Sequence, residues 1–510
     1  MAFSKNVSRR SFLKKVGMGA LAAGVASGFY PFRVSGQPAP LKIMQWTHFV
    51  PAFDQWFDPY AKAWGQNHNP PVDVTVDHIS FADILTRASA EVAAQAGHDL
   101  FFFLAPPPAF EQQVIDHREI VEAVTKKHGP ITQLAQKSTF NPVTKKWFAF
   151  SDFFTIDPFD LHKDIWDAIG KPNGPTTWQE LLEAGDQIRA KFPTLQVPIG
   201  VGYSNDVDSN MAMRALMWSF DAYEQDENQN VALNSANALE ALKFGVQLFK
   251  RANPVVLTWD AVSNNLAFNA HQTGIILNSI SAYRTAQLNN LKVPGTDTPL
   301  ADNTFFVGPL KGPRGTAINS EHVMSSYVIW KFAKQQDLAK EFLVSLVDNY
   351  SSEGFASPGA QLPGTKGAVL NSKLYNTPSF LGAAAPKSVT DPAKRSRAGY
   401  EWLRDQFNND PFNSKPANKL APLFSAVEEP SADGTSVKQG WSTNIGHPGP
   451  AHAAIGQIFD EYVIPQLFAQ AALAHGTPEA LLKQYDDKFK EIFNFWRKQG
   501  LSGGDPSKDK

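Results

Sequence analysis

The chain has 510 residues, of which 43% are hydrophobic and 19% charged, and its formal net charge is −2. This balance excludes a disordered chain, a coiled coil and a collagen-like rod, and the length suits two lobes better than one. There is no cysteine, which rules out disulfides, thiol nucleophiles, zinc–thiolate sites, iron–sulfur clusters and covalently attached c-type haem. We expect no cofactor and no metal.

The N-terminal segment is basic and then mildly apolar. Arg9 and Arg10 are followed by Ser-Phe-Leu-Lys and by a glycine- and alanine-rich stretch at residues 16–28. This stretch is too short and too rich in glycine to span a bilayer comfortably, and the paired arginines resemble the twin-arginine export signal. We predict an export signal over residues 1–39, cleaved between Gly28 and Ala39. No cysteine follows it, so a lipid anchor is not expected.

Removal of this signal makes the chain acidic. Residues 1–39 hold six basic and no acidic residues, so 41 basic residues remain against 49 acidic ones. An acidic chain without a basic stripe is a poor nucleic-acid binder, and no other segment approaches the roughly 18 apolar residues of a membrane span. We therefore expect a soluble periplasmic protein that does not bind nucleic acid.

The mature part begins with alternating strand and helix patterns. An apolar helical face covers residues 47–64, and valines alternate with polar residues at 72–76. The unbroken apolar run at 99–104 is typical of a strand buried on both faces of a sheet. The alternation predicts an α/β fold, with strands at 41–46, 72–76 and 99–104 and helices at 47–64 and 81–96.

Later helices are predicted from start signals and apolar spacing. Thr177 and Glu180 have the spacing of a capping box, and residues 477–479, Thr-Pro-Glu, follow the order of a helix start. Apolar faces predict two more helices, at 234–251 and 337–347. Between about 350 and 452 the chain is rich in Pro, Gly, Ser and Asn, which favours an irregular segment over a site or between lobes. Residues 501–510 are predicted to be a flexible tail.

Four segments resemble the family 1 extracellular solute-binding proteins, the larger carbohydrate-binding receptors of ABC importers. The most specific is Pro-Thr-Thr-Trp-Gln-Glu-Leu at 175–181, which resembles the family's P-x-T-W-x-E-L helix start and follows a crossing segment at 154–166. The others are the buried strand at 99–103, the strand and its ligand-facing end at 268–279, and the loop at 308–315 with the strand and helix after it. The resemblance covers residues 41–364.

The resemblance implies a two-lobed periplasmic binding protein fold of the class II type, with the ligand cleft between the lobes. Lobe 1 would comprise residues 41–156 and about 323–370, and lobe 2 residues 157–322 and about 371–500. It also implies a monomeric receptor that closes on a sugar or polyol by a hinge movement and delivers it to the permease subunits of an ABC transporter. The twin-arginine translocase would be its partner during export.

Carried over position by position, the resemblance also implies ligand-binding residues at strand ends. They are Trp46, Thr47, His48, Leu104, Phe153, Phe154, Asp157, Asn278, Ser279, Met324 and Ser325. Flat aromatic surfaces and a few fixed polar groups suit a sugar, which presents hydroxyls around an apolar C–H face. Each has a structural alternative, since Trp46 and one of the two Phe side chains could pack in the core and Asp157 could cap a turn. Ser281 stands where the family often has a stacking Trp, and residues 203–213 could form a wall of lobe 2.

Two alternative functions are weighed against this one. An exported glycoside hydrolase needs two carboxylates across a cleft, whereas Asp54 and Asp58 have the spacing of a solvated helix edge. The chain also lacks Gly-x-Ser-x-Gly and His-Glu-x-x-His motifs. A receptor of the same fold for a polyamine or a phosphoester would need several carboxylates or basic groups in the cleft. Because the candidate segments offer few of either, we predict a sugar or polyol ligand and no enzyme activity.

Overall fold

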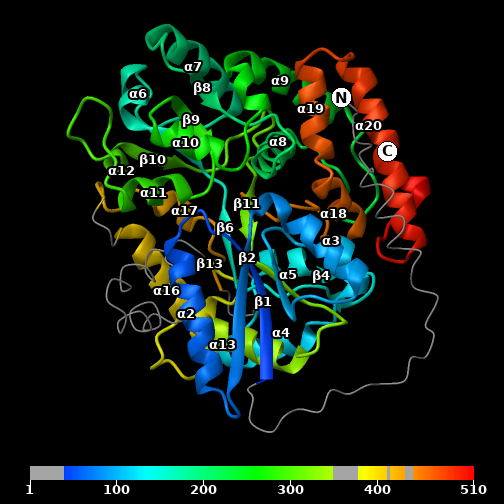
Figure 1. Ribbon diagram of the computed structural model, residues 1–510. Helices are drawn as coiled ribbons and strands as arrows, with labels where there is room; N and C mark the ends of the chain where they lie inside the picture. Colours follow the sequence, from blue (N-terminus) through cyan, green and yellow to red (C-terminus); the bar gives the residue numbers. More distant parts are fainter. Residues whose placement is uncertain (1–38, 349–376, 411–413, 431–439) are drawn as a thin grey trace, which may run out of the picture.

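The structure is a computed structural model that describes residues 39–348, 377–410, 414–430 and 440–510. Residues 1–38 of the predicted export signal, and parts of the stretch after residue 348, lie outside the described residues. The described chain forms two α/β lobes, one above the other in Figure 1, with strands running between them. The prediction of a two-lobed α/β fold is confirmed.

Lobe 1 is built on a four-stranded sheet of order β12-β3-β1-β2. β1 is parallel to β2 and β3, whereas β12 is antiparallel to β3. All four residues of β3 are buried, as its unbroken apolar run predicts, because β3 lies between two other strands. The strands are β1 (Ala39–Trp46), β2 (Val72–Ile79), β3 (Leu100–Phe103) and β12 (Ser326–Ile329).

Helix α2 begins five residues later than the sequence predicts. Pro51 stands at the N-cap, and residues 47–50 form a loop after β1. Proline is well tolerated at a helix start, where its missing N–H has no partner within the helix, although α2 also contains Pro59 in its interior. The other elements of lobe 1 connect and cover the sheet. They are α2 (Ala52–Asn67), η1 (Phe81–Asp83), α3 (Ile84–Ala94), η2 (Pro108–Gln113), α4 (Arg118–His128), α5 (Gln133–Thr139), β4 (Phe140–Asn141), β5 (Lys146–Trp147) and α13 (Gln336–Asp348).

Lobe 2 has its own four-stranded sheet, of order β10-β7-β9-β8. β8 is parallel to β9, and β7 and β10 are antiparallel to their neighbours. The strands are β7 (Phe159–His162), β8 (Val197–Gly200), β9 (Thr273–Leu277) and β10 (Thr304–Val307). The helical elements are α6 (Lys163–Ala168), α7 (Trp178–Lys191), α8 (Val207–Ser219), α9 (Ala236–Arg251), η3 (Pro254–Leu257), α10 (Ser263–Asn269), α11 (Ser281–Leu288) and α12 (Leu300–Asn303).

The start of α7 follows its sequence signal. The Thr177 hydroxyl accepts a hydrogen bond of 3.0 Å from the backbone N–H of Glu180, and such a cap typically contributes about 1 kcal/mol. The Glu180 carboxylate accepts from the backbone N–H of Thr176, one residue before the position that the capping box predicts.

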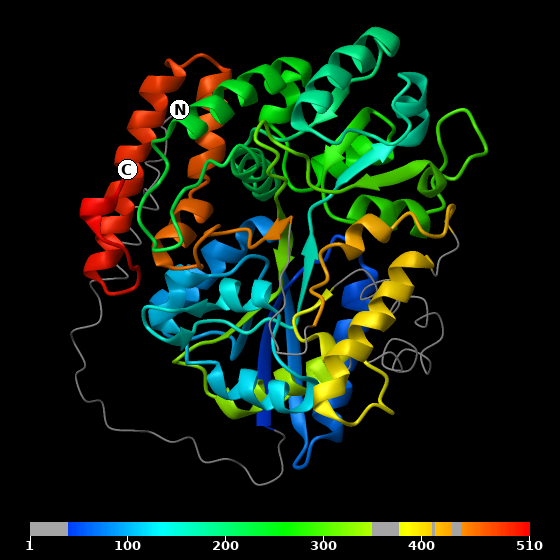
Figure 2. The same cartoon turned by 180° about the vertical axis from the view of Figure 1, so that it is seen from behind.

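A third sheet links the lobes, with strand order β13-β6-β11-β14. Its two central strands are antiparallel and run between the lobes in both Figure 1 and Figure 2. Their register shifts between Glu321 and Val323, which is a β-bulge. The strands are β6 (Phe153–Ile156), β11 (Asn319–Met324), β13 (Thr377–Pro378) and β14 (Trp441–Ser442).

The stretch 371–500, assigned to lobe 2 from the sequence, divides between the lobes. η4 (Leu381–Ala384) and α16 (Pro392–Asn408) pack against each other and against α4 of lobe 1, so the assignment of residues 381–408 is corrected. Glycine permits this packing, because a Cβ at Gly399 would lie 1.9 Å from the carbonyl oxygen of Leu381. The sequence shows a short helical pattern near 397–407 within this stretch, and α16 confirms it but begins five residues earlier, where its buried face contains polar and small residues.

The C-terminal helices pack on α8 and α9 of lobe 2, and α18 also contacts η2 of lobe 1. They are α18 (Ala453–Asp460), α19 (Val463–Ala472) and α20 (Pro478–Lys498), preceded by the short α17 (Ala421–Phe424). None of the helices in the described ranges is long and apolar enough to cross a membrane.

Residues 501–510, predicted to be a flexible tail, are held against the body of the protein. The Asp509 carboxylate forms an ion pair of 2.7 Å with Arg497 of α20, and it accepts a hydrogen bond of 2.8 Å from the backbone N–H of Val231. Lys510 donates its backbone N–H to the carbonyl oxygen of Val231. The short helix η5 (Pro506–Lys508) directly precedes Asp509 in the chain. The prediction is corrected: these polar residues are ordered by pairing, which composition does not reveal.

Candidate functional site

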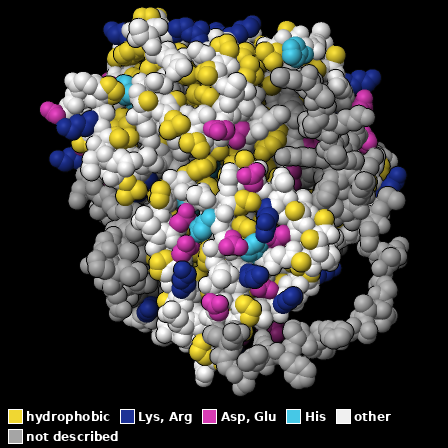
Figure 3. All heavy atoms as spheres, viewed as in Figure 1, with side chains coloured by type: hydrophobic (Ala, Val, Ile, Leu, Met, Phe, Trp, Pro, Cys, Tyr) yellow, Lys and Arg dark blue, Asp and Glu magenta, His cyan; other side chains and the backbone are white. Residues whose placement is uncertain are grey.

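A cavity of about 80 Å³ lies between the two lobes. Lobe 1 contributes the loop after β1 and the ends of nearby elements, lobe 2 contributes the start of α8 and of α11, and the crossing strands β6 and β11 close it at the back. Figure 3 shows hydrophobic side chains gathered across the middle of one face, with acidic side chains among them. The lining residues are Trp46, His48, Phe49, Val50, Phe53, Phe81, Phe102, Leu104, Phe153, Thr155, Val207, Ala261, Ser279, Ile280, Ser281, Arg284, His322 and Val323.

Lobe 1 supplies an aromatic wall. The His48 ring lies 4.7 Å from the Trp46 ring and is stacked on Phe53 at 4.8 Å, and Phe53 in turn approaches Phe153 of β6 at 6.4 Å. Such contacts hold flat surfaces in fixed orientations. Because α2 begins only after Pro51, residues 47–50 form a loop, and His48 in this loop lines the cavity.

His48 is neutral and has a defined tautomer. Burial lowers its pKa to about 3, against a raising effect of the hydrogen bond to Val50. Its Nδ1 accepts from the backbone N–H of Val50 at 2.8 Å, so the ring proton is on Nε2. A neutral imidazole of this tautomer has one donor nitrogen, Nε2, which can donate a hydrogen bond to an acceptor on a ligand.

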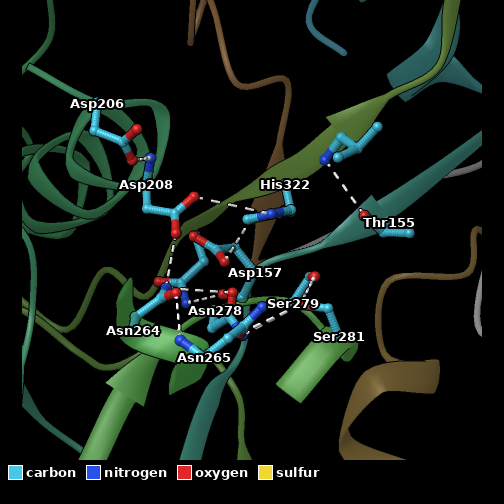
Figure 4. A network of polar contacts seen from close by, with 12 residues as sticks. Thr155, Asp157, Asp206, Asp208, Asn264, Asn265, Asn278, Ser279, Ser281 and His322 are labelled. Atoms are coloured by element: carbon cyan, nitrogen blue, oxygen red, sulfur yellow. Dashed lines mark hydrogen bonds and ion pairs between the residues drawn. The ribbon is translucent and has the colours of Figure 1, made fainter. Parts of the chain in front are cut away.

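His322 is placed by the bulge in β11. Its Nδ1 lies 3.0 Å from the Asp157 carboxylate at the end of β6, and its Nε2 lies 3.9 Å from Asp208 of α8 (Figure 4). Burial disfavours the charged imidazole, but the attraction of Asp157 and Asp208 outweighs it and raises the pKa of His322. His322 therefore joins three elements that belong to the crossing strands and to lobe 2.

A chain of amides runs from Asp208 to the cavity surface. The Asn264 side chain donates to Asp208 at 2.7 Å and to Asn278 at 3.3 Å, and the Asn265 side chain donates to the Ser281 hydroxyl at 3.0 Å (Figure 4). Burial raises the pKa of Asp208 well above its ordinary value, and the charge of His322 opposes that shift. The network holds the Ser281 hydroxyl in place through its hydrogen bond with Asn265.

Helix α11 begins at the cavity. Ser279, Ile280 and Ser281 line the cavity at its start, and Arg284 lines it one turn further along. The N-cap residue Ile280 provides no side-chain cap hydrogen bond. Arg284 is buried, with 1% of its surface exposed.

Five of the eleven residues predicted from the sequence line this cavity: Trp46, His48, Leu104, Phe153 and Ser279. Asp157 and Asn278 lie directly behind it in the polar network. Thr47 is exposed and does not line the cavity, whereas its chain neighbours Trp46 and His48 do.

The other three predicted residues are buried away from the cavity. Phe154 and Met324 pack in a second hydrophobic core together with Leu403 of α16, and Ser325 donates a hydrogen bond to Asp152. Because side chains alternate along a strand, Phe153 faces the cavity and its neighbour Phe154 faces that core.

Sequence reasoning missed His322, Arg284 and several of the aromatic residues. The bulge that turns His322 inward depends on pairing between β6 and β11, which lie far apart in the chain. Phe53 belongs to the apolar helical face predicted at 47–64, and it both packs in the core and lines the cavity. Val207 lines the cavity and lies in the stretch 203–213, which the sequence offers as a wall of lobe 2.

A second, smaller hollow of about 50 Å³ adjoins the cavity and shares three of its lining residues, Phe81, Leu104 and Val207. It extends along Pro106 and Pro107 to the end of α18 and the start of α19. Within the ranges described, no group of three or more His, Cys, Asp or Glu residues is arranged to hold a metal ion.

A family model described as bacterial extracellular solute-binding protein matches residues 51–349, which is more than half of the chain. No curated protein matches the chain.

Solved structures show the same fold at low identity. A solute-binding protein of an ABC transporter from Thermotoga lettingae TMO, bound with α-D-tagatose, has a TM-score of 0.63 at 14% identity and covers 89% of this chain and 99% of its own. A sugar transporter from Arthrobacter chlorophenolicus A6, with bound laminaribiose, has a TM-score of 0.64 at 13% identity, with 89% and 99% covered. A solute-binding protein from Agrobacterium vitis S4, with bound D-mannitol, has a TM-score of 0.59 at 15% identity, with 91% and 99% covered.

Proposed function

The chain belongs to the bacterial extracellular solute-binding protein family, and from that premise we propose that it captures a sugar or polyol between its lobes and delivers it to the permease of an ABC transporter. The observation that carries the proposal is the position of the cavity, which takes side chains from both lobes and from the strands that join them. A solute bound there contacts both lobes at once, and so favours the arrangement in which they close on it.

The chemistry of the cavity supports a ligand with an apolar face and polar edges. Trp46, Phe53 and Phe153 offer flat surfaces, on which the C–H face of a sugar ring can pack. Ser279, Ser281 and Thr155 offer hydroxyls for the ligand's own hydroxyl groups. Three structures of this fold hold tagatose, laminaribiose and mannitol, which supports the same ligand class here.

A glycoside hydrolase is less well supported. Two carboxylates would have to face each other across the cleft, and none of the lining residues that the structure describes is an Asp or a Glu. Asp54 and Asp58 bind His78 on the surface of lobe 1 instead. We propose that the solute is bound without being changed.

Other classes of solute can be tested as ligands of a receptor with this fold. A polyamine would need carboxylates on the cavity surface, and Asp157 and Asp208 lie behind His322. A phosphoester would need basic groups, of which the cavity offers Arg284.

We also propose that the protein is exported by the twin-arginine route to the periplasm, where it acts as a monomer. The paired Arg9 and Arg10 support this. Exchange of both for lysine should abolish periplasmic accumulation; an unchanged periplasmic yield would contradict the route.

The first test is a thermal-shift screen of the mature protein against mono- and oligosaccharides, polyols, polyamines and phosphoesters, with product analysis after overnight incubation. A ligand at 100 times its Kd should add about 2.7 kcal/mol to the free energy of unfolding. A shift with a sugar or polyol and no product supports the receptor; turnover would favour the hydrolase, and a response to polyamines alone would replace the ligand class.

The second test compares two neighbouring residues. Phe153→Ala should weaken binding of the identified ligand by about tenfold or more, because it removes a surface of the cavity. Phe154→Ala should instead lower the free energy of unfolding by about 3–5 kcal/mol through a core cavity, with the Kd little changed. Isothermal titration and denaturant unfolding measure both quantities, and equal effects of the two variants on the Kd would contradict the placement of the site.

A further inference from the structure

The smaller hollow beside the cavity is a continuation of it. Phe81, Leu104 and Val207 line both spaces. A row of rings leads from one space to the other, because the Phe49 ring lies 5.0 Å from the Trp46 ring and 6.4 Å from the Phe81 ring. A ligand that fills the cavity can therefore extend past Phe81 into the hollow.

The lining of the hollow is mostly apolar. Beyond the three shared residues it consists of Ile84, Leu85, Phe103, Ala105, Pro106, Pro107, Phe459, Asp460 and Tyr462. Proline has no backbone N–H, so Pro106 and Pro107 present no backbone donor. Among these described lining residues only Asp460 and Tyr462 have polar side chains, and they stand at the end of α18 and directly before α19. The hollow therefore offers apolar surface with few hydrogen-bonding groups.

Such a lining does not suit a second sugar unit. A sugar carries hydroxyl groups on most of its ring carbons, and each hydroxyl that loses water without gaining a partner weakens binding. The main cavity differs, because His48 carries a proton on Nε2 there and the Thr155 hydroxyl, which accepts from the backbone N–H of Val323, keeps its own proton to donate. The two spaces therefore suit chemically different parts of one ligand.

A group in the hollow would contact both lobes. Leu85 of α3 and the segment after β3 belong to lobe 1, whereas Val207 begins α8 of lobe 2. Phe459 of α18 is held to α8, since its carbonyl oxygen accepts a hydrogen bond of 2.9 Å from the Asn210 side chain and the Arg214 guanidinium lies 5.1 Å from its ring. Binding in the hollow would therefore favour the same closed arrangement as binding in the cavity.

From the continuity of the two spaces and the contrast in their linings we infer that the natural ligand is a glycoside with an aromatic aglycone. Its sugar occupies the cavity, and its aromatic ring occupies the hollow against Phe81, Phe103 and Phe459. The inference rests on the proposed function, of which it specifies the ligand. The hollow has a volume of about 50 Å³ against about 80 Å³ for the cavity, which suits a phenyl ring, with fewer non-hydrogen atoms than a sugar unit, and such a ring packs favourably on aromatic side chains.

The experiment uses matched ligands that differ only in the group attached to the sugar. We would titrate the mature protein by calorimetry with the phenyl and methyl glycosides of D-glucose, D-galactose, D-mannose and D-xylose in both anomeric forms. For at least one sugar the phenyl glycoside should bind about tenfold more tightly than the methyl glycoside, or better, because it removes more apolar surface from water. Cellobiose, maltose and lactose carry a second sugar unit in place of the phenyl ring and should bind no more tightly than the corresponding methyl glycoside.

Variants at Leu85 assign the preference to the hollow. Leu85 is half-buried and lines the hollow but not the cavity. Leu85→Trp fills the hollow and should bring the ratio of the phenyl and methyl affinities close to one, and Leu85→Gln places a polar group against the ring and should lower that ratio several-fold.

Leu473→Trp is the matched control, because Leu473 is 44% exposed after α19 and lines neither space. It should leave the ratio unchanged. Circular dichroism checks that each variant folds, and the wild-type comparison of phenyl glycosides with methyl glycosides and disaccharides decides the question if the Leu85 variants do not.

The outcomes separate this inference from the proposed function. Methyl glycosides that bind as tightly as their phenyl partners overturn the inference and leave the sugar receptor standing. A disaccharide that binds more tightly than the phenyl glycoside of the same sugar also overturns it, and so does a preference for the phenyl group that survives Leu85→Trp. Binding of free sugars or polyols but of no phenyl glycoside overturns the inference alone. Binding of phenol, with no binding of any glycoside, sugar or polyol, overturns the proposed function and the glycoside with it, and keeps only the hollow as an apolar site.

Discussion

At the scale of single residues, the crossing strand β11 carries a buried acid beside the site. Glu321 is fully buried, and its Oε1 accepts hydrogen bonds of 3.1 Å from the backbone N–H of Asn444 and from the Ser138 hydroxyl. Its Oε2 has no hydrogen-bond partner in the described structure. Burial raises the pKa of Glu321 to about 8, although these hydrogen bonds oppose the shift. The folded protein therefore holds a proton near neutral pH that the unfolded chain has released.

We predict that this proton makes stability depend on pH. Because the folded pKa is raised, the contribution to stability is fully present below pH 4.5 and is lost as the pH rises through about 8. Glu321→Gln mimics the protonated acid, so at pH 9 it should be more stable than the wild type by on the order of a few kcal/mol. At pH 5 the two should be similar.

Denaturant unfolding across pH 5 to 9 measures this difference. The matched control is Glu122→Gln on the exposed face of α4, for which the difference from wild type should stay constant across the range. Parallel pH curves for wild type and Glu321→Gln would contradict the prediction.

At the scale of elements, α16 packs closely on η4, and both lie against α4 of lobe 1. Gly399→Ala would place a Cβ 1.9 Å from the carbonyl oxygen of Leu381 and 3.4 Å from the backbone nitrogen of Ala385. Backbone on both sides of the contact would have to shift. We predict a loss of stability of about 1–3 kcal/mol, the usual cost of overpacking, although alanine is the better helix former. Thermal unfolding measures it, with Lys394→Ala on the exposed side of α16 as the control.

The C-terminal tail gives a second prediction at this scale. Asp509→Ala removes the partner of Arg497, whose side chain is 8% exposed, and the acceptor of the Val231 N–H. Removing one partner of a buried pair leaves an uncompensated charge, and we expect a loss of about 3 kcal/mol in the free energy of unfolding. Lys508→Ala, exposed in the same segment, should change stability by less than about 0.5 kcal/mol. Similar melting temperatures for the two variants would restore the expectation of a flexible tail.

At the scale of the whole molecule, the cavity lies where the lobes face each other across β6 and β11. Ligand should therefore bring the lobes together by rotation about the crossing strands. We predict a smaller radius of gyration with saturating ligand than without it, measured by small-angle X-ray scattering. Scattering curves that coincide, with binding confirmed by calorimetry on the same sample, would argue against hinge closure.

Local signals in the sequence determined much of this fold. Apolar periodicity located β1, β2, β3 and most of α9, and the start signals at Thr177 and at residues 477–479 located the starts of α7 and α20. Apolar periodicity and helix caps depend on neighbours within a few positions, so one sequence is enough to find them. The strand ends at Trp46, Leu104 and Ser279 were predicted as cavity residues from the resemblance to family 1 solute-binding proteins, and all three line the cavity.

The tertiary structure alone decided the rest. His322 reaches the cavity through a register shift between strands more than 150 residues apart in the chain, and Phe153 and Phe154 exchange roles with a single change of register. In the sequence, Arg284 belongs to an amphipathic helix with no functional signal. Only the packing of the lobes places the first turn of that helix at the cavity. The C-terminal tail is ordered by the ion pair between Asp509 and Arg497. In the sequence, each of these two residues would be expected to be a solvated surface charge. In each case the deciding contact is between distant parts of the chain, and periodicity and composition do not record such contacts.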